Sequence, residues 1–190
     1  MNTKKYFLGC IVWVLTLLLN PLLVQGQEQQ KDTLSAKHEI RLDIFQLLIL
    51  PGLDLSYEHF IDEVSSWGIS GFLNFDGNKS QGYRFENFEL SPYYRLYFSQ
   101  KTWPNRGFFV QPFLSFVAGT FDSYDAFQFR ENKFLGMAGG AVIGYKWLNR
   151  KNYSFEIHGG FGRYFLSANR GANTENTAYP RIHFTIGKRF

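Results

Sequence analysis

Ser154, Glu156 and His158 come nearest, among the side chains of this sequence, to the types and spacing of a catalytic set. A serine nucleophile, a histidine base and a carboxylate can together cleave an ester through an acyl intermediate. In a β-strand these three side chains share one face, but successive ones lie about 7 Å apart, too far for short side chains to hydrogen-bond directly. Neighbouring strands could complete such a set, so a lipid-modifying enzyme stays open as an alternative.

Other patterns that carry chemistry are missing from the sequence. It has neither His-x-His nor His-Glu-x-x-His spacing, and its histidines fall in separate segments, at His38, His59, His158 and His183. Gly139-Gly140 and Gly159-Gly160 lie inside apolar segments, where they relieve crowding or permit bending and cannot form a phosphate loop. We therefore predict no catalytic residue, no metal and no cofactor.

A larger polar set shares one side of the alternating segments. Its members are Arg41, Asp43, Asp54, Glu58, Glu89, Arg95, Glu156, His158, Arg181 and Arg189. They could line an ion path or a ligand site. The other interpretation is opposite charges packed together inside a barrel that eight strands make too narrow for an open channel. We favour the second, because unpaired charges in such a place are costly.

These residues lie in eight segments in which apolar and polar residues alternate. Such alternation predicts β-strands, and therefore an all-β chain. The first strand is expected over 38–49, before a turn at Pro51-Gly52 and a second strand from Leu53. The others are expected over 67–75, 88–98, 107–120 and 134–147, from Tyr153, and over 179–190. Pro92 should mark a bulge or a strained position in the fourth strand.

The N-terminus has the features of a targeting segment. Lys4 and Lys5 precede an apolar run, so we predict a cleaved secretory signal peptide over 1–26, a flexible lead over 27–37 and a barrel over 38–190. The whole chain carries 20 basic and 16 acidic residues. Because two of the basic residues lie in the signal, we infer no nucleic-acid partner. Cys10, the one cysteine, leaves with the signal, so the exported chain needs no disulfide.

Alternation alone fits a periplasmic lipocalin-like binding barrel, with its apolar side inward, or an outer-membrane barrel, with that side facing lipid. Large aromatic residues in or beside the turns after the second, fourth and sixth strands suggest an interfacial girdle: Trp67, Trp103, Trp147 and Tyr153. These turns are short, whereas the opposite connections are mostly long. The sequence therefore predicts an eight-stranded antiparallel up-and-down transmembrane β-barrel.

The final segment, YPRIHFTIGKRF, places Ile182, Phe184, Ile186 and Phe190 on one side. It resembles the C-terminal strand of bacterial outer-membrane barrels. That strand is recognised by the barrel assembly machinery. The whole pattern resembles the small barrels of the OmpA-transmembrane and OmpX type. SYEHF at Ser56 to Phe60 also resembles a family of small exported barrels known as a domain of unknown function. These resemblances imply an outer-membrane location and a fold, but no activity.

We therefore expect a structural or interaction protein of the outer membrane that is neither an enzyme nor an open porin. Its expected partners are outer-membrane lipid and the barrel assembly machinery. A surface partner would contact the longer loops, 76–84, 121–133 and 167–178. The aromatic residues of 121–133, such as Phe127 and Phe129, would either bind that partner or extend the fifth and sixth strands above the membrane.

Overall fold

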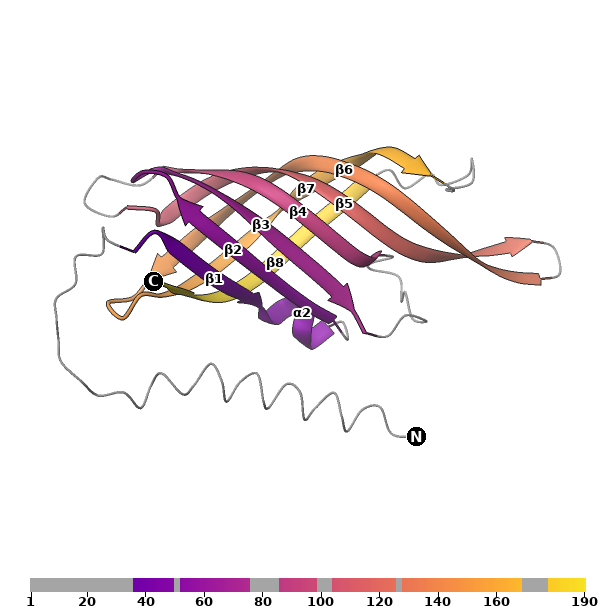
Figure 1. Cartoon of the computed structure of the whole chain (residues 1–190), viewed down its shortest axis with the longest axis horizontal. Helices are drawn as coiled ribbons and strands as arrows, with labels where there is room; N and C mark the ends of the chain where they lie inside the picture. The colour runs from indigo at the N-terminus through magenta and orange to yellow at the C-terminus, as the bar shows by residue number, and fades with distance from the viewer. Residues whose placement is uncertain (1–35, 50–51, 76–85, 99–103, 126–127, 169–177) are drawn as a thin grey trace, which may run out of the picture. The chain divides into compact units, whose positions relative to one another are not determined.

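The chain forms a closed barrel of eight antiparallel strands, in which each strand pairs with the next and β1 pairs with β8 (Figure 1). The computed structural model describes residues 36–49, 52–75, 86–98, 104–125, 128–168 and 178–190. The strands are β1 (His38–Asp43), β2 (Gly52–Phe60), β3 (Ser65–Asn74), β4 (Glu86–Tyr97), β5 (Gly107–Asp125), β6 (Gln128–Leu148), β7 (Tyr153–Ala168) and β8 (Ala178–Arg189). Among the residues with a described structure, no helix is long and apolar enough for a membrane crossing.

Alternation along the strands decides which side chains face the lumen. In β4, Leu90, Tyr94 and Leu96 are exposed on the outer wall. Glu89 and Arg95, on the other parity, are buried. The same division holds in β8, where Ile182 and Phe184 are exposed, while the intervening His183 is buried. The outer wall is therefore largely apolar. The interior holds the charged side chains together with a buried apolar cluster that includes Phe113, Phe134 and Val142.

The expected first strand over 38–49 is wrong in its second half, because α2 (Ile44–Ile49) follows β1 directly. The carboxylate of Asp43 accepts a hydrogen bond from the backbone N–H of Gln46 at 3.1 Å, as an N-cap does. Residues 45–50 are apolar on both parities, so no strand face was preferred there. α2 lies beside β2 and β8, with Gln46 buried and Leu48 exposed (Figure 1).

The expected loop over 121–133 is also wrong, because most of it is paired β-structure. β5 and β6 continue as a hairpin, in which Phe121 pairs with Asn132 and Asp125 pairs with Gln128. Aromatic residues favour strands, and here that preference extends both strands. Residues 76–84 lie outside the described residues. Of 167–178, Ser167 and Ala168 end β7 and Ala178 begins β8, and the remainder lies outside them too.

The irregularities of the sheet are not where the sequence suggested. Pro92 lies opposite Ile69 without a shift in register, so it marks no bulge. The shifts fall between Glu86 and Phe88 in β4 and between Met137 and Ala138 in β6. β6 and β7 approach closely at the predicted glycines: a Cβ atom on Gly140 would lie 2.2 Å from the carbonyl oxygen of Phe161. That distance excludes a side chain there.

Candidate functional site: the charged lumen

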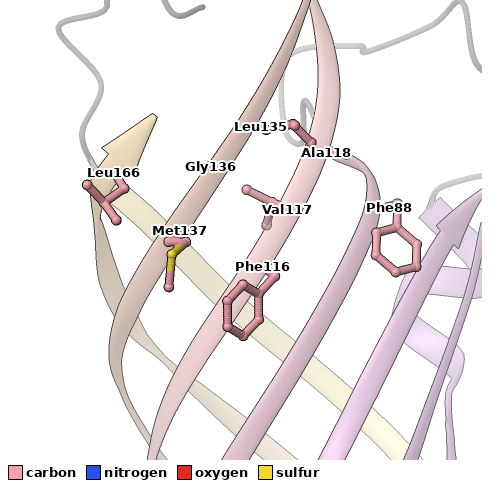
Figure 2. Close-up of a pocket in the computed structure, with 8 residues that line it drawn as sticks. All are labelled: Phe88, Phe116, Val117, Ala118, Leu135, Gly136, Met137 and Leu166. Carbon is pink, nitrogen blue, oxygen red and sulfur yellow. The ribbon is translucent and has the colours of Figure 1, made fainter. Parts of the chain in front are cut away.

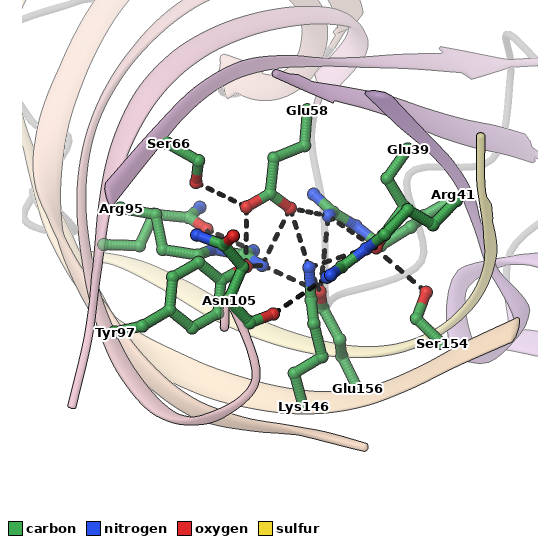
Figure 3. Close-up of polar contacts among 12 residues, drawn as sticks. Glu39, Arg41, Glu58, Ser66, Arg95, Tyr97, Asn105, Lys146, Ser154 and Glu156 are labelled. Atoms are coloured by element: carbon green, nitrogen blue, oxygen red, sulfur yellow. Dashed lines mark hydrogen bonds and ion pairs between the residues drawn. The ribbon is translucent and has the colours of Figure 1, made fainter. Parts of the chain in front are cut away.

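One charged group fills the lumen towards the end where β1 begins and β8 ends (Figure 3). We call it the basal cluster, and it consists of Glu39, Arg41, Glu58, Arg95, Lys146, Glu156 and Arg189. Every member is almost fully buried. The members come from β1, β2, β4, β6, β7 and β8, so their side chains meet across the barrel and not only along one wall.

Glu58 is at the centre of the basal cluster. It forms ion pairs with Arg41, with Arg95 at 3.2 Å and with Lys146 at 2.9 Å. The hydroxyl groups of Tyr97 and Ser66 donate hydrogen bonds to its other oxygen at 2.6 Å and 2.5 Å. Both carboxylate oxygens are therefore occupied, and burial makes these contacts stronger than they would be in water.

The other two carboxylates of the basal cluster share the same cations. Glu39 contacts Lys146 at 2.9 Å and Arg189 at 3.2 Å. Glu156 contacts Lys146 at 2.9 Å and Arg95 at 2.7 Å. Only Arg41 Nε and Glu156 Oε2 have no hydrogen-bond partner among the described atoms of this cluster. The arrangement is a nearly saturated network that crosses the lumen.

Aromatic rings and a turn close the basal end. The guanidinium of Arg95 lies 3.9 Å from the ring centre of Phe109, and that of Arg189 lies 4.0 Å from the ring centre of Phe60. Asn105, with φ at 50°, accepts a hydrogen bond from Arg189 at its backbone carbonyl at 2.8 Å. Its side chain donates to the backbone carbonyl of Asp62 at 2.7 Å. The basal cluster is thus tied to the turns beneath it.

A second charged group lies nearer the other end of the lumen. We call it the distal cluster, and it consists of Asp43, Asp54, Glu89, His158, Arg181 and His183. His183 Nδ1 is hydrogen-bonded to the Asp43 carboxylate and lies 3.9 Å from Asp54 Oδ2. Arg181 Nε donates to His183 Nε2 at 3.3 Å, and Arg181 Nη2 lies 3.1 Å from Glu89. The rings of His158 and His183 stack with 4.7 Å between their centres.

The structure separates the three residues that resembled a catalytic set. Ser154 donates its hydroxyl hydrogen to Glu39 at 3.0 Å, and Glu156 belongs to the basal cluster. His158 Nδ1 lies 3.7 Å from Glu156 Oε2 and has no hydrogen-bond partner among the described residues. No hydrogen-bonded relay therefore joins Ser154 to His158.

All ten residues of the predicted polar set have side chains that face the lumen, and the structure divides them between the two clusters. The prediction left out Glu39, Lys146 and His183, although all three have the parity of the polar set and could have been found from it. It also left out Gln46, which is buried in α2, because that segment was expected to be a strand.

The residues of the predicted girdle that are described lie at the basal end. Trp67 and Trp147 are 46% and 49% exposed on the outer wall. Tyr153 is half-buried, with the ammonium of Lys188 at 4.3 Å from its ring centre. Trp103 lies outside the described residues. Of the terminal set, Ile182, Phe184 and Phe190 are exposed on the outer wall, and Ile186 is half-buried.

An apolar hollow of about 280 Å³ lies on the outer wall across β4, β5, β6 and β7, near the two register shifts (Figure 2). Phe88, Phe116, Leu135 and Leu166 contribute exposed side chains to it. No titratable side chain lines it, so it offers contact surface and not chemistry.

No protein-family model, curated protein or solved structure matches this chain.

Proposed function

We propose that this protein is a small outer-membrane β-barrel with a structural or interaction role, closed to solute flow. The observation that carries the proposal is the orientation of its side chains. Large apolar residues are exposed on the outer wall of every strand, for example Ile40, Leu55, Leu73, Leu96, Phe108, Ile143, Ile157 and Phe184. Water would make such a continuous apolar surface unfavourable, whereas lipid covers it at little cost.

Two features of the outer wall support a lipid environment. Trp67 and Trp147 lie at the basal end, where amphipathic rings would meet the headgroups. The apolar hollow between Phe88 and Leu166 is a shape that a lipid acyl chain fills readily. We therefore propose outer-membrane lipid as the principal partner, and export through a cleaved signal peptide.

The basal cluster supports a closed lumen. Arg41, Lys146 and Arg95 join carboxylates from β1, β2 and β7, so their side chains occupy the space that a channel would need. Opening a path would leave several buried charges without partners, which is strongly unfavourable. The filled lumen therefore favours a structural or interaction role over that of a porin.

The alternatives receive less support. A lipocalin-like barrel turns its apolar parity inward around a ligand, whereas here most large exposed apolar side chains lie on the outer wall and charged side chains cross the lumen. A lipid-modifying enzyme needs its nucleophile beside its base, but Ser154 is bonded to Glu39. We propose that any specific contact is made instead by the segments 76–84 and 167–178 and by the β5–β6 hairpin over 121–133.

The location is tested by cell fractionation, followed by gel migration of heated and unheated protein. We expect the folded chain in the outer-membrane fraction, with a migration that shifts on boiling, and no large steady conductance in planar bilayers. Recovery as a water-soluble periplasmic protein would overturn the membrane proposal. Porin-like currents would overturn the closed lumen alone.

We also propose that the assembly machinery reads the outward set Ile182, Phe184, Ile186 and Phe190. The variant Phe190→Ser should reduce insertion and leave protease-sensitive protein, and Gln27→Ser, in the predicted lead, is the control. Equal assembly of the two variants would show that Phe190 is not part of a recognition signal.

A further inference from the structure

We propose that the distal end of the lumen binds one divalent transition-metal ion, with Asp43, Asp54 and His183 as its ligands. This inference goes beyond a structural role. It depends on the interior of the barrel alone, so it holds whether or not lipid surrounds the outer wall.

The geometry of the three side chains fits an ion. One ligand atom from each of Asp43, Asp54 and His183 lies within 4.8 Å of the other two, and all three residues are buried. Protein-bound zinc is tetrahedral, with ligands about 2.0–2.2 Å from it, so two ligand atoms of one ion are about 3.3–3.6 Å apart. His183 and Asp43 now share a direct hydrogen bond, which an ion between them would replace, and Asp54 Oδ2 already lies 3.9 Å from His183 Nδ1.

Two residues next to Asp43 carry a buried side-chain oxygen atom that has no hydrogen-bond partner among the described residues: Thr185 with Oγ1 and Gln46 with Oε1. Thr185 is the Cα partner of Asp43, and both side chains are buried, so they lie side by side on the lumen face. Gln46 follows in α2, with its backbone N–H on the Asp43 carboxylate. Buried polar atoms are rarely left unpaired, and an ion with its bound water would satisfy both.

The distribution of charge in the lumen also favours a bound cation at the distal end. Among the buried residues that the structure describes there are seven carboxylates, Glu39, Asp43, Asp54, Glu58, Glu86, Glu89 and Glu156. Five cations face them, namely Arg41, Arg95, Lys146, Arg181 and Arg189. The basal cluster holds four of those cations and three of the carboxylates, so four carboxylates and one cation, Arg181, remain towards the distal end among the described buried residues. A divalent cation there would reduce this excess of negative charge.

The ligand set favours a particular class of ion. Imidazole nitrogen together with carboxylate oxygen suits zinc and its neighbours, whereas calcium and magnesium prefer oxygen alone. Binding at His183 Nδ1 requires the ring proton to sit on Nε2, which now accepts a hydrogen bond from Arg181. Arg181 then keeps Glu89 at 3.1 Å and Ser91 at 3.3 Å, so its charge stays compensated.

The test uses the full folded protein, stripped with a chelator and titrated with Zn²⁺ by calorimetry. A second possible site needs a control, since His38 Nδ1 and His59 Nδ1 lie 3.4 Å apart elsewhere on the barrel. We expect one ion per chain, at least tenfold weaker binding in Asp54→Asn, and unchanged binding in His59→Gln. Ca²⁺ should bind far more weakly than Zn²⁺.

Titration of the unmodified protein with Co²⁺ gives a measurement that needs no variant to fold. We expect visible absorption bands from nitrogen and oxygen ligation, which Zn²⁺ displaces. Absence of both Zn²⁺ binding and these bands in the folded wild-type protein would overturn the proposal. So would binding that is lost in His59→Gln but retained in Asp54→Asn.

Discussion

The basal cluster contains three carboxylates and four cations, whereas the distal cluster contains three carboxylates, one guanidinium and two histidines. Glu58, in the basal cluster, contacts three cations and two hydroxyl groups. Near the distal cluster, by contrast, Thr185 and Gln46 keep oxygen atoms without a hydrogen-bond partner among the described residues. One barrel thus holds a charged network in which cations outnumber carboxylates and another in which carboxylates outnumber guanidinium groups.

The difference shows that buried charge in a barrel can serve two purposes. In a saturated network each charged group pairs with several others. Removal of one member leaves buried charges unpaired, which lowers the stability of the fold. In an under-satisfied network, removal of one carboxylate relieves repulsion. Substitutions of the same kind should therefore change the free energy of unfolding by different amounts at the two ends of the lumen.

The largest effect is expected for Glu58→Gln, which leaves Arg41, Arg95 and Lys146 with one carboxylate fewer. We expect the free energy of unfolding to fall by about 3–5 kcal/mol. Asp54→Asn, measured with a chelator present, should change it by less than about 1 kcal/mol. Urea unfolding followed by the gel shift gives both values, and equal losses would remove the distinction between the clusters.

A smaller effect is expected at β3, where two glycines provide a matched pair. A Cβ atom on Gly68 would lie 2.3 Å from the Tyr93 ring, whose hydroxyl group accepts a hydrogen bond from Arg41. On Gly71 it would meet nothing closer than the carbonyl oxygen of Glu89, at 3.9 Å. Gly68→Ala should therefore destabilise the barrel by about 1–3 kcal/mol, and Gly71→Ala by much less. Comparable urea midpoints for the two variants would contradict this.

Removal of a buried hydroxyl group should have a smaller effect on stability, but one whose sign differs between the two ends of the lumen. Ser154→Ala removes a hydrogen bond to Glu39 and should cost about 1–2 kcal/mol. Thr185→Val removes a buried hydroxyl group that has no partner, so it should be neutral or stabilising by about 1 kcal/mol in the presence of a chelator. Thermal unfolding of both variants under one condition provides the comparison. A destabilised Thr185→Val would mean that its hydroxyl group is bonded in solution.

The smallest effect is expected outside both clusters, at the turn between β2 and β3. Backbone N–H groups of Val64 and Ser65 donate to the Asp62 carboxylate at 2.8 Å and 2.7 Å and hold its pKa below the ordinary value of 3.8. Because the pKa is lower in the folded state, the stabilisation is present above that value and is lost as the pH falls through the folded pKa. Asp62→Asn should therefore remove the part of the stability that is lost at low pH. Acid unfolding that is the same in the variant and in the unmodified protein would contradict this prediction.

Much of the fold could be predicted from alternation. The positions of Arg95 and Glu58 on the polar parity, and of Leu96 and Leu55 on the other, follow from a period of two. α2 could not be predicted in this way, because the capping bond between Asp43 and Gln46 overrides an apolar run that has no preferred face. The hairpin beyond Thr120 was one of two interpretations, and cross-strand pairing decided between them.

The two clusters could be predicted only as one polar set. Parity places Arg181 and Arg189 on the same face, but it does not show that Arg181 meets Glu89 while Arg189 meets Glu39. These contacts depend on the tilt of the strands and on register across the barrel. The same limit explains why Ser154 resembled a partner of His158, although it lies against a carboxylate from β1.

The sequence separation within the basal cluster has a consequence for the order of folding. Glu39 contacts Lys146, Ser154 and Arg189, which lie 107, 115 and 150 positions further along the chain. Contacts of such long range slow the search for the native state, since large loops must close before they form. We therefore expect the network around Glu39 to be completed late in folding, when β8 docks against β1, so that its completion and closure of the barrel coincide.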